Sequence, residues 1–228
     1  MTIYFVRHGH PDYANDCLTP LGKKQAEAAA ERLKSVGIEA VYSSTKGRAL
    51  ETAEYTASKL GLRVIPCDFM REIGWASVDG EPILANGHPW RLVEHFASAD
   101  LPLSDHAWRE REPFSRSRLV ESNKTVAEGL DAWLAELGYC REGDYYRVNT
   151  ENTDRVVSMF SHGGASAAAM AHLFNIPFPQ FIGLLAIDYT GVTVVRLGGK
   201  PGDRVYPRIV SSDASHIVGL EAELVYDN

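Results

Sequence analysis

Two histidines in this chain stand where enzymes with parallel sheets commonly carry reactive side chains. His8 follows a run of mainly apolar residues and precedes Gly9, and His162 has the same setting before Gly163. β-Branched and aromatic runs of this kind predict strands that are buried on both faces. Because ligands bind beyond the carboxyl ends of such strands, we expect both imidazoles to face one crevice.

Cationic groups accompany the two histidines. Arg7 directly precedes His8, and Arg48 opens a predicted helix, so two guanidinium groups with the geometry of phosphate ligands are available. Glycine after each histidine lets the backbone approach a ligand closely. The helix predicted after Gly163 adds free N–H groups and a partial positive charge at its amino end. This cluster predicts a pocket for a phosphoryl group.

The overall composition requires such a pocket to be local. The chain has 228 residues, 45% hydrophobic and 23% charged, with a net charge of −7. The acidic balance argues against nucleic acid or an anionic membrane as the main partner. We find no secretory leader and no long apolar window, so we expect a soluble cytoplasmic protein. The three cysteines form no CxxC pair, so the sequence indicates no disulfide framework or zinc site.

Strands and helices alternate through the first third of the chain, with crossovers long enough for parallel pairing. A helix beginning at Thr19-Pro20 and ending before Gly37 has favourable capping residues. The expected elements are strands over 2–6, 38–42 and 62–65 and helices over 20–34 and 45–60.

The alternation fails between about 71 and 122, where aromatic residues including Trp75, Trp90 and Trp108 are scattered among prolines and charges. We interpret residues 73–122 as an inserted cap or lid with a short helix near 90–98. Beyond it we expect a helix over 125–137, a polar connector over 139–152 and a strand over 155–160. An alanine-rich helix to 174, a hairpin of 181–188 with 191–197 and a strand over 205–210 should follow. The fold class is therefore α/β: one domain of three layers, helix–sheet–helix, with a mostly parallel central sheet.

Four stretches of the chain resemble the histidine phosphatase superfamily, also called phosphoglycerate mutase-like, and specifically its phosphatases. They are 6–9 (VRHG), 18–26 (LTPLGKKQA), 43–52 (SSTKGRALET) and 161–164 (SHGG). The resemblance implies a catalytic His8 nucleophile, a phosphate held by Arg7, Arg48 and a catalytic His162, and no cofactor or metal. Gly9, Gly163 and His10 border that pocket. Residues 71–75 (REIGW) resemble the family segment that supplies the proton donor, which would be Glu72.

General chemistry agrees with these roles. A neutral imidazole that attacks phosphorus forms a phosphohistidine and divides one difficult displacement into two. Fixed cations stabilise the charge on the equatorial oxygens. A buried carboxylic acid such as Glu72 can protonate the leaving alkoxide, and its carboxylate can then deprotonate the attacking water. We expect a phosphatase that acts on a small phosphorylated metabolite.

Several assignments leave alternatives open. Glu81, Asp79 or another carboxylate of the insertion could be the acid in place of Glu72. His10, where the family usually carries Glu or Gln, could contact substrate or lie in an exposed loop. The tryptophans could form the core of the lid or line the substrate site. The arginines 109, 111, 116 and 118 alternate with Glu110 and Glu112, which favours a solvated face over a second phosphate site.

Other function classes remain as competitors. His8, His10 and Asp12 spell an HxHxD pattern found in metallohydrolases, although Tyr13 stands where one such family carries a further histidine. A mutase is the competitor within the superfamily, but residues 10–14 (HPDYA) lack the groups with which mutases grip the glycerate. A non-catalytic binding module would not need the two arginines and two histidines. Hydrolysis is therefore the favoured reaction.

Overall fold

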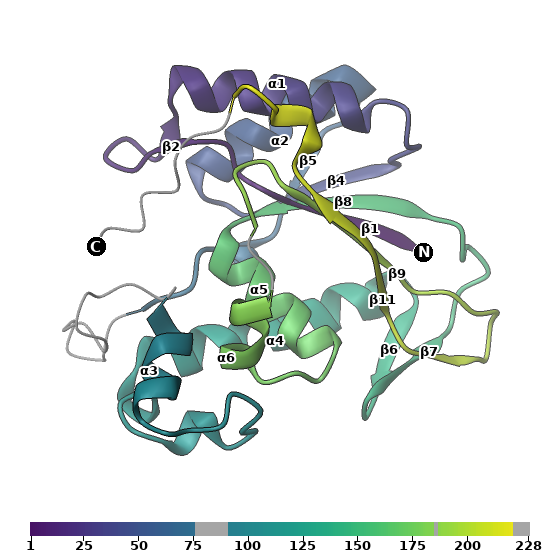
Figure 1. The fold of residues 1–228 in the computed structure, drawn as a ribbon. Coiled ribbons are helices and arrows are strands. Elements are labelled where there is room, and N and C mark those ends of the chain that lie inside the picture. Colours follow the sequence, from purple (N-terminus) through teal and green to yellow (C-terminus); the bar gives the residue numbers. More distant parts are fainter. Residues whose placement is uncertain (76–90, 185–186, 221–228) are drawn as a thin grey trace.

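A six-stranded sheet lies between two layers of helices in the computed structural model, which describes residues 1–75, 91–184 and 187–220 (Figure 1). The four strands β1, β8, β4 and β5 are mutually parallel, and β9 runs antiparallel to both β1 and β11. In sheet order the strands are β11 (Arg208–Asp213), β9 (Val192–Arg196), β1 (Thr2–Arg7), β8 (Val156–Ser161), β4 (Ala40–Ser43) and β5 (Val64–Pro66). The predicted fold class is confirmed.

Strand β1 occupies the interior of the sheet because its side chains are apolar on both faces. Ile3 and Phe5 belong to the larger hydrophobic cluster, whereas Val6 belongs to a second cluster on the opposite face. All three side chains are at most 1% exposed. Alternate residues of a strand point to opposite faces, so a strand buried on both sides must be apolar throughout. This explains why the opening run of the chain contains so few polar residues.

The helices cover both faces of the sheet (Figure 1). Helices α1 (Pro20–Leu33) and α2 (Gly47–Leu60) pack together on one face, and α4 (Arg118–Glu136) and α5 (Gly163–Leu173) pack together on the other. Helix α1 begins as predicted, because the Thr19 hydroxyl accepts a hydrogen bond from the Gly22 N–H at 3.1 Å. In the three described ranges, no helix has the length and apolar character needed to cross a membrane.

Shorter elements complete the described chain. Two small sheets are formed by β10 (Arg204–Val205), β7 (Tyr145–Val148) and β6 (Tyr139–Glu142), and by β2 (Pro11–Asp12) and β3 (Cys17–Leu18). The short helices are η1 (Asp68–Met70), α3 (Leu92–Ser98), η3 (Trp108–Glu110), η4 (Phe114–Arg116), α6 (Phe178–Leu184) and η5 (Ser215–Ile217).

The region expected to be a cap is built around aromatic side chains. Phe96, Trp108 and Phe114 are fully buried, and Phe114 stacks on Phe96 with ring centroids 5.4 Å apart. Helix α3 matches the short helix predicted near 90–98, whereas α4 begins at Arg118, earlier than the predicted start at 125. Trp90 lies outside the described residues. Trp108 therefore belongs to a hydrophobic core, one of the two alternatives expected for the tryptophans, whereas Trp75 is half-buried and lies near Gly164 and Glu72.

Two predictions of local structure are wrong. Residues 181–184 do not form a strand: they belong to α6, because Phe178, Phe181 and Ile182 recur with helical spacing and bury one face. Residues 185–186 of the predicted strand lie outside the described residues. The 139–152 connector is not irregular, since β6 and β7 form a hairpin within it. Tyr139, Tyr146 and Val148 are fully buried there. The burial of these side chains favours strands although most of the neighbouring residues are polar. The strand expected over 205–210 is divided between β10 and β11.

Candidate active site

The register between β1 and β8 brings the two histidines together. Arg7 pairs with Ser161 in the parallel ladder, so the residues that follow, His8 and His162, leave the sheet side by side. The His8 N–H donates to the Ser161 carbonyl oxygen at 2.9 Å, and the two imidazole centroids are 5.1 Å apart. The two imidazoles thus lie together beyond the carboxyl ends of β1 and β8, as predicted.

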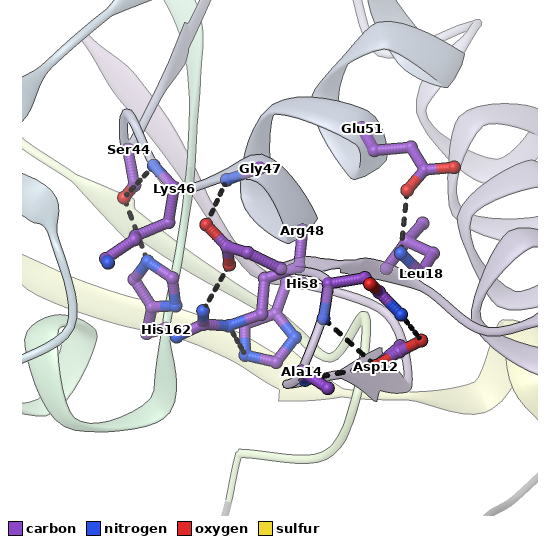
Figure 2. A network of polar contacts seen from close by, with 12 residues as sticks. His8, Asp12, Ala14, Leu18, Ser44, Lys46, Gly47, Arg48, Glu51 and His162 are labelled. Atoms are coloured by element: carbon purple, nitrogen blue, oxygen red, sulfur yellow. Dashed lines mark hydrogen bonds and ion pairs between the residues drawn. The ribbon is translucent and has the colours of Figure 1, made fainter.

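The contacts of His8 determine which ring nitrogen carries the proton. The His8 side chain is buried, with 1% exposure, and its Nδ1 lies 2.7 Å from the Gly9 carbonyl oxygen. A carbonyl oxygen can only accept, so Nδ1 must carry the hydrogen and the neutral ring has its lone pair at Nε2. The Arg48 Nε–H donates to that Nε2 at 3.3 Å (Figure 2). Burial, and then the charge of Arg7, lower the His8 pKa well below 6.5, which keeps the ring neutral.

Arg48 is held by a carboxylate that the sequence did not single out. Its Nη1 donates to Asp16 Oδ1 at 2.6 Å, and Asp16 Oδ2 accepts the Gly47 backbone N–H at 2.9 Å. Burial tends to raise the Asp16 pKa, but these hydrogen bonds from Gly47 and Arg48 outweigh it, and the pKa is lower than usual. Asp16 therefore ties the loop that follows β2 to the first turn of α2. The Arg48 side chain is consequently fixed beside His8.

Arg7 lies in a second set of contacts. Its Nη1 donates to the Ile187 carbonyl oxygen at 2.6 Å, and its guanidinium carbon lies 4.2 Å from the centroid of the Tyr189 ring. The Tyr189 ring is also 5.8 Å from that of His8 and 5.3 Å from that of His10. Tyr189 was expected only as a hairpin turn, yet it forms one wall of the site.

His162 caps the amino end of α5. Its Nε2 lies 2.8 Å from the Ser44 hydroxyl oxygen (Figure 2), which also accepts the Lys46 N–H. Its buried Nδ1 has no hydrogen-bond partner among the described residues. Burial, and then the neighbouring ring of His8, lower the His162 pKa well below 6.5. The site thus contains a buried ring nitrogen whose hydrogen-bonding capacity is available to a ligand.

Glu72 lies against the same helix terminus. Its Oε1 accepts backbone N–H groups from Ile73 and from Ala165, each at 3.0 Å. Burial raises the Glu72 pKa above 4.5, although the Ile73 N–H and the Arg7 charge oppose it. Gly164 permits this approach, because a Cβ there would lie only 2.8 Å from Glu72 Oε1. The alternative acids Glu81 and Asp79 lie outside the described residues.

His10, Gly9 and Gly163, the other residues expected at the pocket, are held by contacts with α1 and α2 or lie at the start of α5. The His10 N–H donates to Gln25 Oε1 at 2.7 Å, and its half-buried ring bonds to the Thr19 hydroxyl through Nδ1 at 2.9 Å. The Gly9 N–H donates to the Thr52 hydroxyl at 3.1 Å. Gly163 is the first residue of α5 and is buried. His10 is therefore anchored to α1 by two hydrogen bonds instead of lying in an exposed loop.

The HxHxD pattern does not assemble as a ligand set. Asp12 Oδ1 accepts N–H groups from Ala14 (Figure 2) and Asn15, and its Oδ2 accepts from the Asn15 side chain at 2.8 Å. These bonds shape a local turn. Across residues 1–75, 91–184 and 187–220, no three His, Cys, Asp or Glu side chains are grouped as metal ligands.

Comparison with known proteins identifies the family. The model of the "Histidine phosphatase superfamily (branch 1)" matches residues 3–205. "Putative phosphoserine phosphatase 2" of Hydrogenobacter thermophilus is 23% identical over 213 residues, covering 90% of this chain and 93% of its own. "Probable phosphoglycerate mutase GpmB" of Proteus mirabilis is 29% identical over 119 residues, so the match spans about half of that protein: 48% of each chain.

Solved structures give the same result. A mycobacterial glucosyl-3-phosphoglycerate phosphatase superposes with a TM-score of 0.61 and 25% identity, covering 92% of this chain and 96% of its own. The family model covers most of the chain, and the matched range includes the site residues described above, which lie near the carboxyl ends of β1 and β8. The chain belongs to the histidine phosphatase superfamily, branch 1.

Proposed function

We propose that the protein hydrolyses phosphate monoesters through a phosphohistidine formed at His8. The observation that carries this proposal is the state of the His8 ring. Its Nδ1–H is held by the Gly9 carbonyl, its Nε2 lone pair is directed toward Arg48, and its pKa is well below 6.5. An imidazole in this state is a nucleophile at neutral pH, and the adjacent cations attract a phosphate.

In the first displacement, His8 Nε2 forms a bond to phosphorus as the bond from phosphorus to the ester oxygen breaks. Arg48, which donates to Nε2 in the absence of substrate, turns its donors to the phosphoryl oxygens together with Arg7. If the Ser44 hydroxyl donates to His162 Nε2, the unpartnered Nδ1 carries a hydrogen and donates to the same oxygens. Glu72 transfers its proton to the departing oxygen and becomes a carboxylate.

The second displacement releases phosphate. The Glu72 carboxylate accepts a proton from water as the water oxygen bonds to phosphorus, and the bond from phosphorus to His8 Nε2 breaks. Each group has then returned to its starting state, so the cycle is closed. The raised pKa of Glu72 suits this double role, since Glu72 must hold a proton before the first displacement and take one from water in the second.

The substrate we propose is a small phosphorylated metabolite. The relatives named above for phosphoserine, glucosyl-3-phosphoglycerate and phosphoglycerate support this class. We favour hydrolysis over mutase activity because residues 10–14 lack the mutase groups and because Asp12 is engaged in its own turn. A mutase must also exclude water from the phosphoenzyme.

Removing the nucleophile should abolish turnover. We expect His8→Ala to lower kcat for p-nitrophenyl phosphate by roughly 10³-fold or more, because no other group completes the first displacement. Rapid quenching in alkali of the wild-type enzyme with labelled substrate should trap a phosphohistidine that is missing in the variant. His95→Gln, in a histidine packed against Phe114, is the control and should keep its label and turnover. Unchanged turnover of His8→Ala would refute the proposal.

Glu72 should control the pH dependence. The free enzyme is active with His8 neutral and Glu72 protonated, so kcat/KM falls at low pH through a His8 pKa below 6.5 and at high pH through a Glu72 pKa above 4.5. Glu72→Gln should remove the high-pH limb and lower kcat/KM for an alkyl phosphate roughly 10²-fold, with a smaller loss of kcat/KM for p-nitrophenyl phosphate. An unaltered pH profile, or equal losses for the two substrates, would exclude Glu72 as the acid.

The ion pair between Asp16 and Arg48 should matter for phosphate binding. We expect Asp16→Asn to lower kcat/KM and to weaken inhibition by inorganic phosphate, each by roughly tenfold, because Arg48 loses a charge-assisted partner in a partly exposed position. Asp12→Asn is the matched control in the same loop and should change neither constant. Equal constants for Asp16→Asn and the wild-type enzyme would show that Arg48 is positioned without Asp16.

A further inference from the structure

A cationic cavity apart from the His8 site lies between α4, α5 and the segment that contains η3. Its volume is about 200 Å³, smaller than the roughly 300–1,000 Å³ of pockets that bind drug-sized ligands, so it suits a small ligand. Ala168 and Ala171 of α5 form part of its wall. The polar side chains that line it include those of His106, Arg109, Asn123, Arg141 and His172. Among the described residues that line the cavity, none carries a carboxylate.

Arg141 presents a charge to this cavity and forms no ion pair with a carboxylate of the described residues. Its Nε donates to the Gly143 carbonyl at 2.8 Å, and its Nη1 donates to the His172 carbonyl at 2.9 Å and to the Tyr146 hydroxyl at 2.8 Å. Its Nη2 donates to Asn175 Oδ1 at 2.6 Å. These neutral acceptors fix the guanidinium plane and use four of its five N–H groups, which leaves one donor and the full charge.

Arg109 is the second guanidinium on the cavity. Its Cζ lies 5.0 Å from the centroid of the Trp108 ring, and no carboxylate of the described residues lies within ion-pair distance of it. Nearby arginines differ: Arg111 pairs with Asp105, and Arg116 pairs with Glu112. Stacking on an indole fixes Arg109 without neutralising it. Arg109 is exposed, as the predicted solvated face requires, but it differs from Arg111 and Arg116 in having no acidic partner among the described residues.

The surrounding polar groups favour an anion. Two acids lie one residue away from Arg141 in the hydrogen-bond network, and both are engaged. The Asp131 carboxylate is used by His172 Nε2 at 2.8 Å and by the Tyr146 hydroxyl at 3.0 Å, and Asp144 accepts a hydrogen bond from the Asn175 side chain. The indole N–H of Trp108, a fully buried residue in the cavity wall, has no acceptor among the described residues. Arg141, which is held before a ligand arrives, and the exposed Arg109 together form a site at which a multiply charged oxyanion replaces water favourably.

We propose that this cavity binds a phosphate group between Arg109 and Arg141, at a site separate from His8. The ligand would be inorganic phosphate itself or the phosphate of a small metabolite. Both sources offer the same chemistry: several oxygen acceptors and at least one full negative charge. Because the cavity wall includes α5, whose amino end carries His162, one helix connects the two sites. The proposal does not depend on the reaction at His8.

Titration of the ¹⁵N-labelled protein with inorganic phosphate tests the site, with two tryptophan indole signals as separate reporters. Trp108 lines the cavity, whereas Trp75 lies against Gly164 beside Glu72 and reports on the His8 site. We expect both signals to shift, with independent dissociation constants. Arg109→Gln should weaken binding at Trp108 by about tenfold and leave the Trp75 curve unchanged. Arg116→Gln removes the same charge from an exposed arginine outside the cavity and should change neither curve.

Glucose 6-phosphate and glycerol 3-phosphate, titrated into His8→Ala to prevent turnover, distinguish free phosphate from a phosphorylated metabolite. Tighter binding of either ester than of inorganic phosphate at Trp108 would assign the site to a metabolite, and weaker binding would assign it to phosphate. A Trp108 signal that does not shift at millimolar phosphate would overturn the proposal. A shift that responds equally to Arg109→Gln and Arg116→Gln would overturn it too.

Discussion

The hydrogen bond between His8 Nδ1 and the Gly9 carbonyl is the contact on which the rest of the site depends. It fixes the neutral tautomer with its lone pair at Nε2. A buried imidazole surrounded by Arg7, Arg48 and His162 is costly to protonate, so burial and neighbouring charge preserve the form that this hydrogen bond selects. The cations that would bind a phosphate therefore also keep the proposed nucleophile unprotonated.

The fold supplies these partners from distant parts of the chain. Parallel pairing of β1 with β8 sets His8 beside His162, and pairing of β8 with β4 brings Ser44 to the His162 ring. Helix α2 contributes Arg48 at its first turn, where Asp16 holds it across a loop. Each of these residues is fixed by backbone geometry or by a second polar contact. Such preorganisation reduces the reorganisation needed when charge develops on a phosphoryl group.

Local sequence was sufficient for the parts of the site that local structure determines. The strand of β1, the capped start of α1 and the helix after Gly163 follow from adjacent residues, and they position His8 and His162. Asp16, Ser44 and Tyr189 could not be found in that way. Asp16 contacts Arg48, 32 positions away, and Ser44 contacts His162, 118 positions away. Those contacts exist only after the sheet has formed.

The same distinction explains the two errors in local structure. Residues 178–184 are too short an apolar run for periodicity alone to separate strand from helix, and packing against α3 and α5 decided the outcome. The hairpin of β6 and β7 was not predicted, because its many polar residues are typical of a connector. Its arginines are used in tertiary contacts: Arg141 bonds to the end of α5 and Arg147 bonds to Gly202.

The stereochemical course at phosphorus tests the central claim most directly. A thiophosphate monoester made chiral by oxygen-isotope labelling would be hydrolysed in water of the third isotope, and the configuration of the product determined. Two in-line displacements, at His8 and then at water, each invert phosphorus, so the account predicts overall retention. Overall inversion would mean that water attacks the ester directly, and it would contradict a phosphohistidine at His8.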